Sequence, residues 1–401
     1  MSESSAQRMY DLAVVGGDGI GPDVTAVAVD CVRAAAARFG FTASTTDYDL
    51  GAEPYLRTGI VLPGETREAL RRHDAILLGA VGDPRVPPGV LERGLIVALR
   101  IALRQSVNVR PVRLYPGVES PVRGVTPENC DLVILRENTE GLYTGGGETV
   151  HAGTAEAVAL QHSVSTVPAT REIVEFGFRL ACARRKRFTL CHKTNILTHA
   201  GRLWEEVVAE VGEDFPDVER DYVHVDAMCL HLPLDPGRFD VVVTDNLFGD
   251  IISDLGATVQ GGLGLAASAN HNPLGTAPSM FEPVHGSAPD IAGKGLANPA
   301  AAALSAALCL AALGEREAAL AVEGATAAVL ASLPALAGPA MGASTTEIGA
   351  RIVERIGSAD PVGDPGTSLM SALAALAPSG PTNLSRGASP PPTAGGGRAA
   401  R

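Results

Sequence analysis

Lysine is rare in this sequence, and one lysine occupies a position suited to proton transfer. Of the 32 basic residues in the 401-residue chain, only Lys186, Lys193 and Lys294 are lysines. Lys193 lies in the run TLCHKTN, where an apolar stretch gives way to polar residues. A lysine can exchange a proton near neutral pH if its surroundings lower its pKa, whereas an arginine cannot. Lys193 is therefore a candidate acid or base, and an ordinary surface lysine is the alternative.

Three aspartates have the chemistry of a divalent-metal site. Asp250 and Asp254, in DNLFGDIISDLG, are four residues apart, so on a helix their carboxylates lie on one face about 6 Å apart. Carboxylate oxygens are ligands that suit Mg²⁺ or Mn²⁺. Asp226, in HVDAMCLHL, is the best candidate for a third ligand. Taken singly, Asp250 also fits a helix cap, and Asp254 fits an exposed acid.

A local excess of arginine interrupts a chain whose formal net charge is −13. Residues 99–113 include no acid and contain four arginines, namely Arg100, Arg104, Arg110 and Arg113. Arg136 follows at the end of another apolar run and is a candidate to join them. The guanidinium group matches a carboxylate in bidentate fashion, so this cluster suits a small polycarboxylate. A solvated helix face is the alternative.

A glycine loop near the N-terminus, GGDGIGP at residues 16–22, follows a predicted strand and precedes a predicted helix. Its spacing lacks the third glycine of the dinucleotide-binding fingerprint G-x-G-x-x-G. The loop therefore argues against a Rossmann site. A tight turn that needs backbone freedom explains it at least as well as ligand contact.

Short apolar runs alternate with helical patterns along most of the chain. The strands expected are DLAVVGG, AILLGAV, LVILREN, FTLCHK and FDVVVTDN, and TAVAVDCVRAAAARF is an expected helix. This alternation predicts an α/β architecture with a largely parallel core sheet. The apolar stretch 300–313 is too short for a membrane span, and Asn298 as N-cap, Pro299 at the first position and Gly314 beyond the end frame a buried helix.

Composition limits the classes of protein to which the chain can belong. A hydrophobic share of 46% with 19% charged residues is typical of a globular chain of two or three domains. The acidic balance argues against a generic nucleic-acid or anionic-membrane binder. The six cysteines show no metal-ligand spacing and favour a reducing compartment, the cytoplasm.

Both ends of the chain differ in composition from its centre. We expect a disordered leader at residues 1–8. We also expect a low-complexity, largely disordered tail at 359–401, with one short helix within 360–377.

Seven motifs in order resemble a known family, the metal-dependent β-decarboxylating, or isocitrate/isopropylmalate, dehydrogenases. The motifs are GGDGIGP, NVRPVRLYPGVESP, RENTEGLY, HKTN, HVDAMCLHL, TDNLFGDIISD and EPVHGSAPDIAGKGLANP, and the resemblance runs from about residue 10 to about 355. It implies a two-domain α/β fold without Rossmann topology and with the active site in the interdomain cleft. The large, cofactor-binding domain would comprise 9–106 and 263–358. The small domain, 107–262, would form the interface of a homodimer.

The resemblance also implies roles for individual residues. Arg100, Arg110 and Arg136 would bind the two substrate carboxylates. Asp250 and Asp254 would hold Mg²⁺ or Mn²⁺ together with Asp226 from the second subunit. Lys193, also from the second subunit, would act with Asp226 as the base, and Tyr143 would be the acid.

The same resemblance places the cofactor on one loop. The residues implied are His285, Gly286, Ser287, Ala288, Pro289, Asp290 and Asn298. The carboxylate of Asp290 can accept hydrogen bonds from ribose hydroxyls but would repel a 2′-phosphate, so NAD is expected over NADP.

Three apolar residues bear on the substrate. Ile96, Val97 and Ile196 would leave a third carboxylate or a hydroxyl unpaired and favour an isopropyl group. The expected reaction is the oxidative decarboxylation of 3-isopropylmalate in leucine biosynthesis, as in the actinobacterial members of the family. D-malate, tartrate, homoisocitrate or another 3-alkylmalate as substrate, and a catalytically inactive homologue, are the alternatives.

Overall fold

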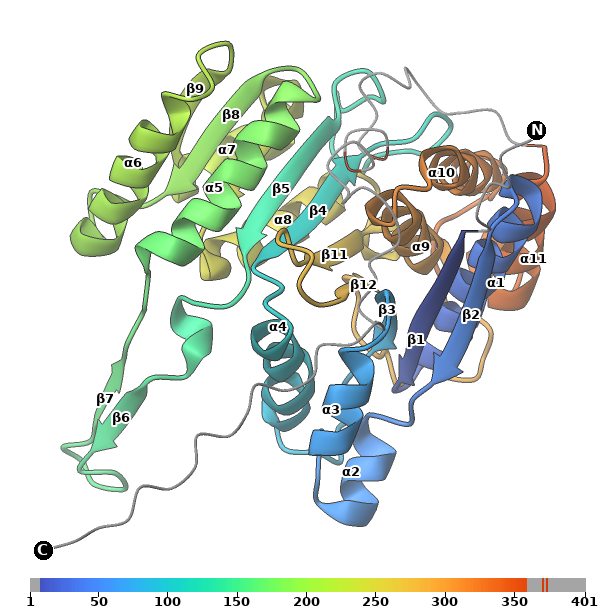
Figure 1. Ribbon diagram of the computed structural model, residues 1–401, viewed down its shortest axis with the longest axis horizontal. Helices are drawn as coiled ribbons and strands as arrows, with labels where there is room; N and C mark the ends of the chain where they lie inside the picture. The colour runs from blue at the N-terminus through green and yellow to red at the C-terminus, as the bar shows by residue number, and fades with distance from the viewer. Residues whose placement is uncertain (1–7, 359–369, 371–372, 374–401) are drawn as a thin grey trace, which may run out of the picture.

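A single ten-stranded sheet forms the centre of the computed structural model, which describes residues 8–358, Met370 and Leu373 (Figure 1). Across the sheet the strands are β2 (Thr42–Asp47), β1 (Met9–Gly17), β3 (Ala75–Ala80), β12 (Ser279–Pro283), β11 (Ala267–His271), β4 (Val107–Arg113), β5 (Asp131–Glu137), β10 (Val241–Thr244), β8 (Arg187–His192) and β9 (Glu219–His224).

The sheet is parallel on both flanks and antiparallel at its centre. The pairs β12–β11, β11–β4 and β4–β5 are antiparallel, and the pairs on either side of them are parallel. The prediction of a largely parallel sheet therefore holds for the flanks and is wrong for the central strands. Because β11 and β12 follow each other closely in the chain, they pair as antiparallel neighbours without a crossover helix.

Helices cover the flanks of the sheet in two groups. Around the β1–β3–β12 flank lie α1 (Gly21–Phe39), α9 (Ala300–Ala312), α10 (Arg316–Leu330) and α11 (Thr345–Ile356). Around the β5–β10–β8 flank lie α5 (Val167–Cys182), α6 (Thr198–Gly212), α7 (Val225–Leu234) and α8 (Asn246–Val259). The short helices α2 (Ala52–Thr58) and α3 (Gly64–Leu70) lie between β2 and β3 in the chain, and α4 (Ala98–Ala102) lies between β3 and β4.

Two strands stand apart from the main sheet. The hairpin of β6 (Gly147–Val150) and β7 (Val158–Gln161) projects from the body, and all of its strand residues are exposed (Figure 1). An isolated two-stranded hairpin is marginally stable in water, so an exposed one with Val150 and Val158 on its surface lacks the packing that stabilises most sheets.

The buried apolar helix lies where the sequence predicts, with a different start. Helix α9 begins at Ala300, Pro299 is its N-cap, and the Asn298 side chain accepts a hydrogen bond from the Ala300 amide at 3.0 Å. Gly314 follows the end with φ +86°. No helix within the described residues is long and apolar enough to cross a membrane.

The predicted leader and tail lie mostly outside the described residues, with three exceptions. Arg8 is described and pairs with Glu315 at 2.5 Å, so the chain is anchored one residue earlier than the leader prediction. Met370 and Leu373, within the predicted tail, are 2% and 6% exposed and belong to the main hydrophobic core. Both positions are helical and lie within 360–377, where the sequence analysis expects one short helix; the rest of the predicted tail lies outside the described residues.

Candidate active site

Three of the predicted arginines converge near the centre of the sheet. Arg100 lies in α4, Arg110 in β4 and Arg136 at the end of β5, and their exposures are 7%, 7% and 2%. Burial, together with the neighbouring Arg136, lowers the pKa of Arg110 to about 10, and burial and Arg100 lower the pKa of Arg136. Arg110 and Arg136 both remain cationic at neutral pH. Such a group of buried like charges is strongly attractive to a dianion.

One aspartate lies against two of these arginines. Asp250 pairs with Arg136, lies 3.6 Å from the Arg110 Nη1 atom, and accepts a 2.6 Å hydrogen bond from the Tyr143 hydroxyl. Burial alone would raise the pKa of Asp250, but Arg136, Tyr143 and Arg110 hold it below its ordinary value. The Tyr143 pKa is raised by burial and by this hydrogen bond, so the phenol keeps its proton.

The second aspartate on α8 is more weakly held. Asp254 lies 3.6 Å from Arg110, and 60% of its side chain is exposed. Burial raises its pKa, and the neighbouring Asp250 adds to the rise, against the opposing effect of Arg110. The four-residue spacing on α8 thus brings both carboxylates to the arginine group, as the sequence predicts.

Sequence reasoning missed the side chains that orient these arginines. Glu282, on β12, accepts a 3.0 Å hydrogen bond from Arg100 and a 2.8 Å bond from Asn270. Asn108 accepts from Arg110 Nε at 2.6 Å and donates to Asn270 at 2.9 Å. These bonds form a buried polar chain across β12, β11 and β4. Only the pairing of strands distant in sequence brings these residues together.

Asn246 was also missed, although a signal for it existed. Its Oδ1 atom accepts from the Nε and Nη2 atoms of Arg136 at 3.0 and 2.8 Å, which fixes the guanidinium plane. Asn246 precedes Asp250 by four residues, so the helical spacing that links the two aspartates also places this amide on the same face.

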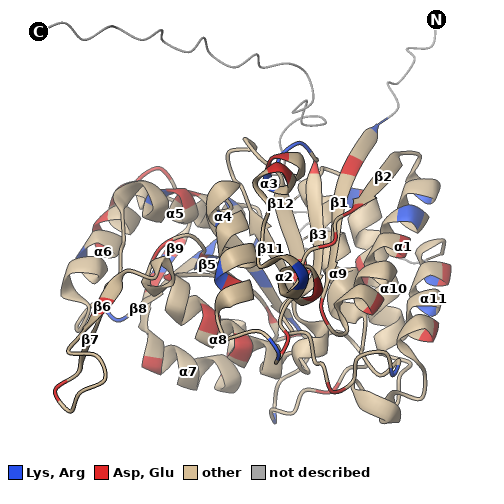
Figure 2. Cartoon of the chain, turned by 90° about the horizontal axis from the view of Figure 1, so that it is seen from below, with Lys and Arg blue, Asp and Glu red and all other residues tan. Residues whose placement is uncertain are grey.

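Lys193 and Asp226 form a separate, more exposed pair. Lys193 follows β8, Asp226 is in α7, and their Nζ and Oδ1 atoms are 2.5 Å apart. The hydrogen bond from Lys193 holds the Asp226 pKa below its usual range. Among the described residues no group of three His, Cys, Asp or Glu side chains is close enough to hold a metal, so Asp226 does not complete a site with Asp250 and Asp254 of its own chain. The acidic segments of α7 and α8 lie along the same side of the molecule (Figure 2).

The three predicted apolar residues also lie in two places, some beside the arginine group and one beside the Lys193–Asp226 pair. Ile96 and Val97 are half-buried in a π-helical turn (Glu92–Val97) that leads directly into α4 and Arg100. Such turns often occur at functional sites. Ile196 is 67% exposed in the turn after Lys193, where its amide donates to the Lys193 carbonyl at 3.0 Å. Ile96 and Val97 thus accompany the arginines, whereas Ile196 accompanies the Lys193–Asp226 pair.

The predicted cofactor loop lies against the glycine loop. The Ile20 amide donates to the Ser287 carbonyl at 2.8 Å, and Gly19 has φ +59°. A Cβ atom on Gly19 would lie 2.0 Å from that carbonyl oxygen, so no other residue fits. Pro289 and Asp290 are exposed, and Ala288 has φ +40°. The glycine loop is therefore a tight turn that supports the second loop.

Asn298 and His285, which flank the predicted cofactor loop, already have hydrogen-bond partners within the chain. The Asn298 side chain already bonds the Ala300 amide and the Leu336 carbonyl, both at 3.0 Å. The His285 Nδ1–H group donates to the Gly286 carbonyl at 3.0 Å, and burial lowers the pKa of this imidazole. Gly286 is exposed beside it.

The remaining arginines of the predicted cluster point elsewhere. Arg104 is exposed and pairs with Glu172 at 3.1 Å. Arg113 pairs at 2.9 Å with Glu323 of α10, on the other face of the sheet from Arg110, because residues three apart on a strand point to opposite faces. Spacing in the sequence could not separate these two from the group at the site.

Comparisons with known proteins decide the family. The model of the isocitrate/isopropylmalate dehydrogenase family matches residues 11–352. This chain belongs to that family. The 3-isopropylmalate dehydrogenase of Thermobifida fusca is 53% identical over 350 residues, which cover 87% of this chain and 98% of the relative. The enzyme of that name from Mycobacterium tuberculosis strain H37Rv is 56% identical over 321 residues, 80% of this chain and 94% of the relative.

Solved structures of the isocitrate/isopropylmalate dehydrogenase family agree. The crystal structure of isocitrate dehydrogenase from Methylococcus capsulatus superposes with a TM-score of 0.78 at 36% identity, covering 87% of this chain and all of the other. The predictions of the family and of its α/β fold without Rossmann topology are confirmed. The roles of the individual site residues remain predictions.

Proposed function

We propose that this chain catalyses the NAD-dependent oxidative decarboxylation of (2R,3S)-3-isopropylmalate to 4-methyl-2-oxopentanoate and CO₂, a step of leucine biosynthesis. The observation that carries the proposal is the group of three buried arginines beside the paired Asp250 and Asp254. The arginines bind the two substrate carboxylates and exclude water from them. Relatives named 3-isopropylmalate dehydrogenase at more than half identity support this substrate.

The residues present fit a divalent cation and NAD. Asp250 and Asp254 offer carboxylate oxygens from one helix face, and 38% and 60% of their side chains are exposed. Such hard oxygen donors suit Mg²⁺ or Mn²⁺. The exposed carboxylate of Asp290 suits the ribose hydroxyls of NAD. When bound, the cation polarises the substrate C2 oxygen, and the nicotinamide accepts a hydride.

Proton transfer is assigned to two side chains. Lys193 acts with Asp226, which it contacts, as the base: its Nζ atom, in the uncharged amine form, accepts the proton of the substrate C2 hydroxyl. Tyr143 keeps its proton next to Asp250 and donates it from the phenol oxygen to C3 after CO₂ has left. Arg136 lies over the Tyr143 ring with 4.8 Å between the guanidinium carbon and the ring centroid, which orients the phenol.

The complete site is assembled from two copies of the chain. Lys193 and Asp226 are presented outward, and the helices beside them expose large apolar side chains: Leu230 at 65% and Leu234 at 80% on α7, and Ile251 at 52% on α8. Apolar patches of this kind mark protein interfaces. A homodimer through α7 and α8 covers them and brings Lys193 and Asp226 of each subunit to the arginines of the other.

The two halves of the sheet support the proposed domain division. Strands β2, β1, β3, β12 and β11 come from segments 9–106 and 263–358, the proposed cofactor domain, and β4, β5, β10, β8 and β9 come from 107–262. All six cysteines are free thiols, which accords with the cytoplasm as the proposed location.

The substrate assignment is tested by turnover on a panel of 2-hydroxy diacids with NAD and Mn²⁺. We expect kcat/KM for 3-isopropylmalate to exceed the values for D-malate, tartrate, homoisocitrate and isocitrate by about tenfold or more, because Ile96 and Val97 leave polar side groups unpaired. If kcat/KM for 3-isopropylmalate were below a tenth of the value for another diacid, that diacid would be the substrate instead. Absence of turnover on every diacid would favour an inactive homologue.

A further inference from the structure

The central strands of the sheet have one face that carries the site and one that does not. On β4, Arg110 bonds Ser253 of α8 at 2.7 Å, which identifies the site face. Alternate residues point away from it, and Pro111 lies on the opposite face with Arg113. On β11, Ser268 bonds Asn108 on the site face at 2.8 Å, so Ala267 points to the opposite face.

Helices cover this opposite face on either side of its centre. Helix α5 packs over β5 and β10, where a Cβ on Gly177 would meet Val243 and Leu135. Helix α9 packs over β11, β12 and β3. The line where β4 meets β11, here called the seam, lies between these two helices and joins the two proposed domains. Its apolar residues need another cover.

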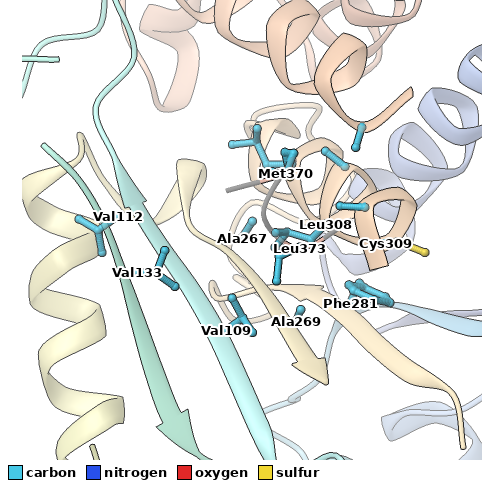
Figure 3. Close-up of a cluster of buried hydrophobic side chains, with 14 of the residues drawn as sticks. Val109, Val112, Val133, Ala267, Ala269, Phe281, Leu308, Cys309, Met370 and Leu373 are labelled. Atoms are coloured by element: carbon cyan, nitrogen blue, oxygen red, sulfur yellow. The ribbon is translucent and has the colours of Figure 1, made fainter. Parts of the chain in front are cut away.

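Met370 and Leu373 supply that cover. Both residues are helical, and both are buried in the main hydrophobic core. Met370 lines a cavity of about 20 Å³ together with Pro111, Ala267 and Leu304, so this cavity has walls from both halves of the sheet and from Met370. Figure 3 shows Leu373 beside Leu308 of α9, among the buried side chains of β4, β11 and β12.

The covering residues come from a part of the chain outside the region shared with relatives. The family match ends at residue 352, and the aligned part of the Thermobifida fusca enzyme already comprises 98% of its length. That relative has almost no sequence left to match residues 359–401. The contact therefore lies outside the part of the chain that the family model matches.

We propose that the seam is a docking surface for this chain's own C-terminal segment, anchored by Met370 and Leu373, which fastens the two halves of the sheet together. Met370 and Leu373 identify the C-terminal segment as the occupant of the seam, because their side chains are only 2% and 6% exposed. The two anchors lie on the face opposite Arg110, so their burial stabilises the fold away from the site.

The test replaces both anchors in the full-length chain, Met370→Asp with Leu373→Asp. The matched control introduces the same two charges at exposed apolar positions, Ile60→Asp with Leu274→Asp, which are 54% and 52% exposed. We expect the anchor variant to lose about 5 °C or more in Tm and the control about 1 °C or less. Hydrogen exchange of peptides covering β4 and β11 should rise about tenfold in the anchor variant, and that of β9 should not.

Equal Tm values and equal exchange in the two variants would overturn the proposal. The proposal would also be overturned if β4 and β11 of the unchanged protein lost their protection from hydrogen exchange on dilution. A second copy of the chain would then occupy the seam. If the aspartate pair does not fold, the single variants Met370→Ala and Leu373→Ala apply the same criteria with smaller shifts. The kcat of the folded anchor variant at 25 °C should stay within about twofold of the unchanged protein, which separates this test from that of the reaction.

Discussion

Replacing Lys193 with alanine will lower kcat by about a thousandfold and leave NAD binding unchanged, because general acid–base groups contribute roughly 10²–10⁴ in rate. Lys193 is the lysine held by Asp226, at 2.5 Å, and it lies far in the chain from the predicted cofactor loop. Steady-state kinetics with 3-isopropylmalate measure the loss, and titration calorimetry measures NAD affinity.

Two further variants separate proton transfer from charge. Lys193→Arg keeps a cation beside Asp226 but cannot give up a proton at neutral pH, so it should be as inactive as the alanine variant. Lys186→Ala removes another lysine, one that lies 3.7 Å from Asp217 at the surface, and should keep full activity. A kcat near that of the unchanged protein in Lys193→Ala or Lys193→Arg would remove the assigned role.

The second large effect is expected at Asp250 and Asp254, the two aspartates of α8. Replacing either one should lower activity equally, but replacing Asp250 should lower the stability of the protein more. Asp250→Asn and Asp254→Asn each remove a carboxylate proposed to bind the metal, and each should lower kcat about a thousandfold. Asp250 also neutralises Arg136 and Arg110, whereas Asp254 is 60% exposed. Asp250→Asn should therefore lower the free energy of unfolding by about 1–2 kcal/mol, discounted for the 38% exposure of that side chain, and Asp254→Asn by less.

Thermal unfolding with and without substrate checks this explanation. A dianionic substrate can replace the negative charge that Asp250→Asn removes beside Arg136 and Arg110, so 3-isopropylmalate should raise the Tm of that variant more than the Tm of Asp254→Asn. If the two variants lose the same stability and gain equally from substrate, Asp250 does not have the proposed neutralising role.

Sequence patterns predicted the strands that are continuously apolar and missed those that are polar. The runs predicted as strands became β1, β3, β5, β10 and β8. The edge strands β2 and β9 escaped because most of their residues are exposed and polar. The central strands β11 and β12 escaped because they are short and carry Asn270 and Glu282 toward the site. Strand identity there depends on pairing with distant partners, which local patterns do not contain.

The candidate site was predicted in part for the same reason. Asp250 and Asp254 were found because a helix relates them locally, and Arg100 and Arg110 because they share a stretch without acids. Glu282 could not be found, since its contact with Arg100 joins residues 182 positions apart. Spacing does not show that Asp226 lies apart from Asp250. The family resemblance implied this division, and the described residues of the chain show no site that joins the two aspartates.

The central claim is that each active site combines the arginines and Asp250 of one subunit with Lys193 and Asp226 of the other. Mixing Lys193→Ala subunits with Asp250→Asn subunits tests it, since each variant alone is expected to be inactive. Random exchange makes half of the dimers mixed, each with one intact site, so the predicted activity is about a quarter of that of the unchanged enzyme. No recovered activity in dimers shown by mass spectrometry to be mixed would contradict the claim.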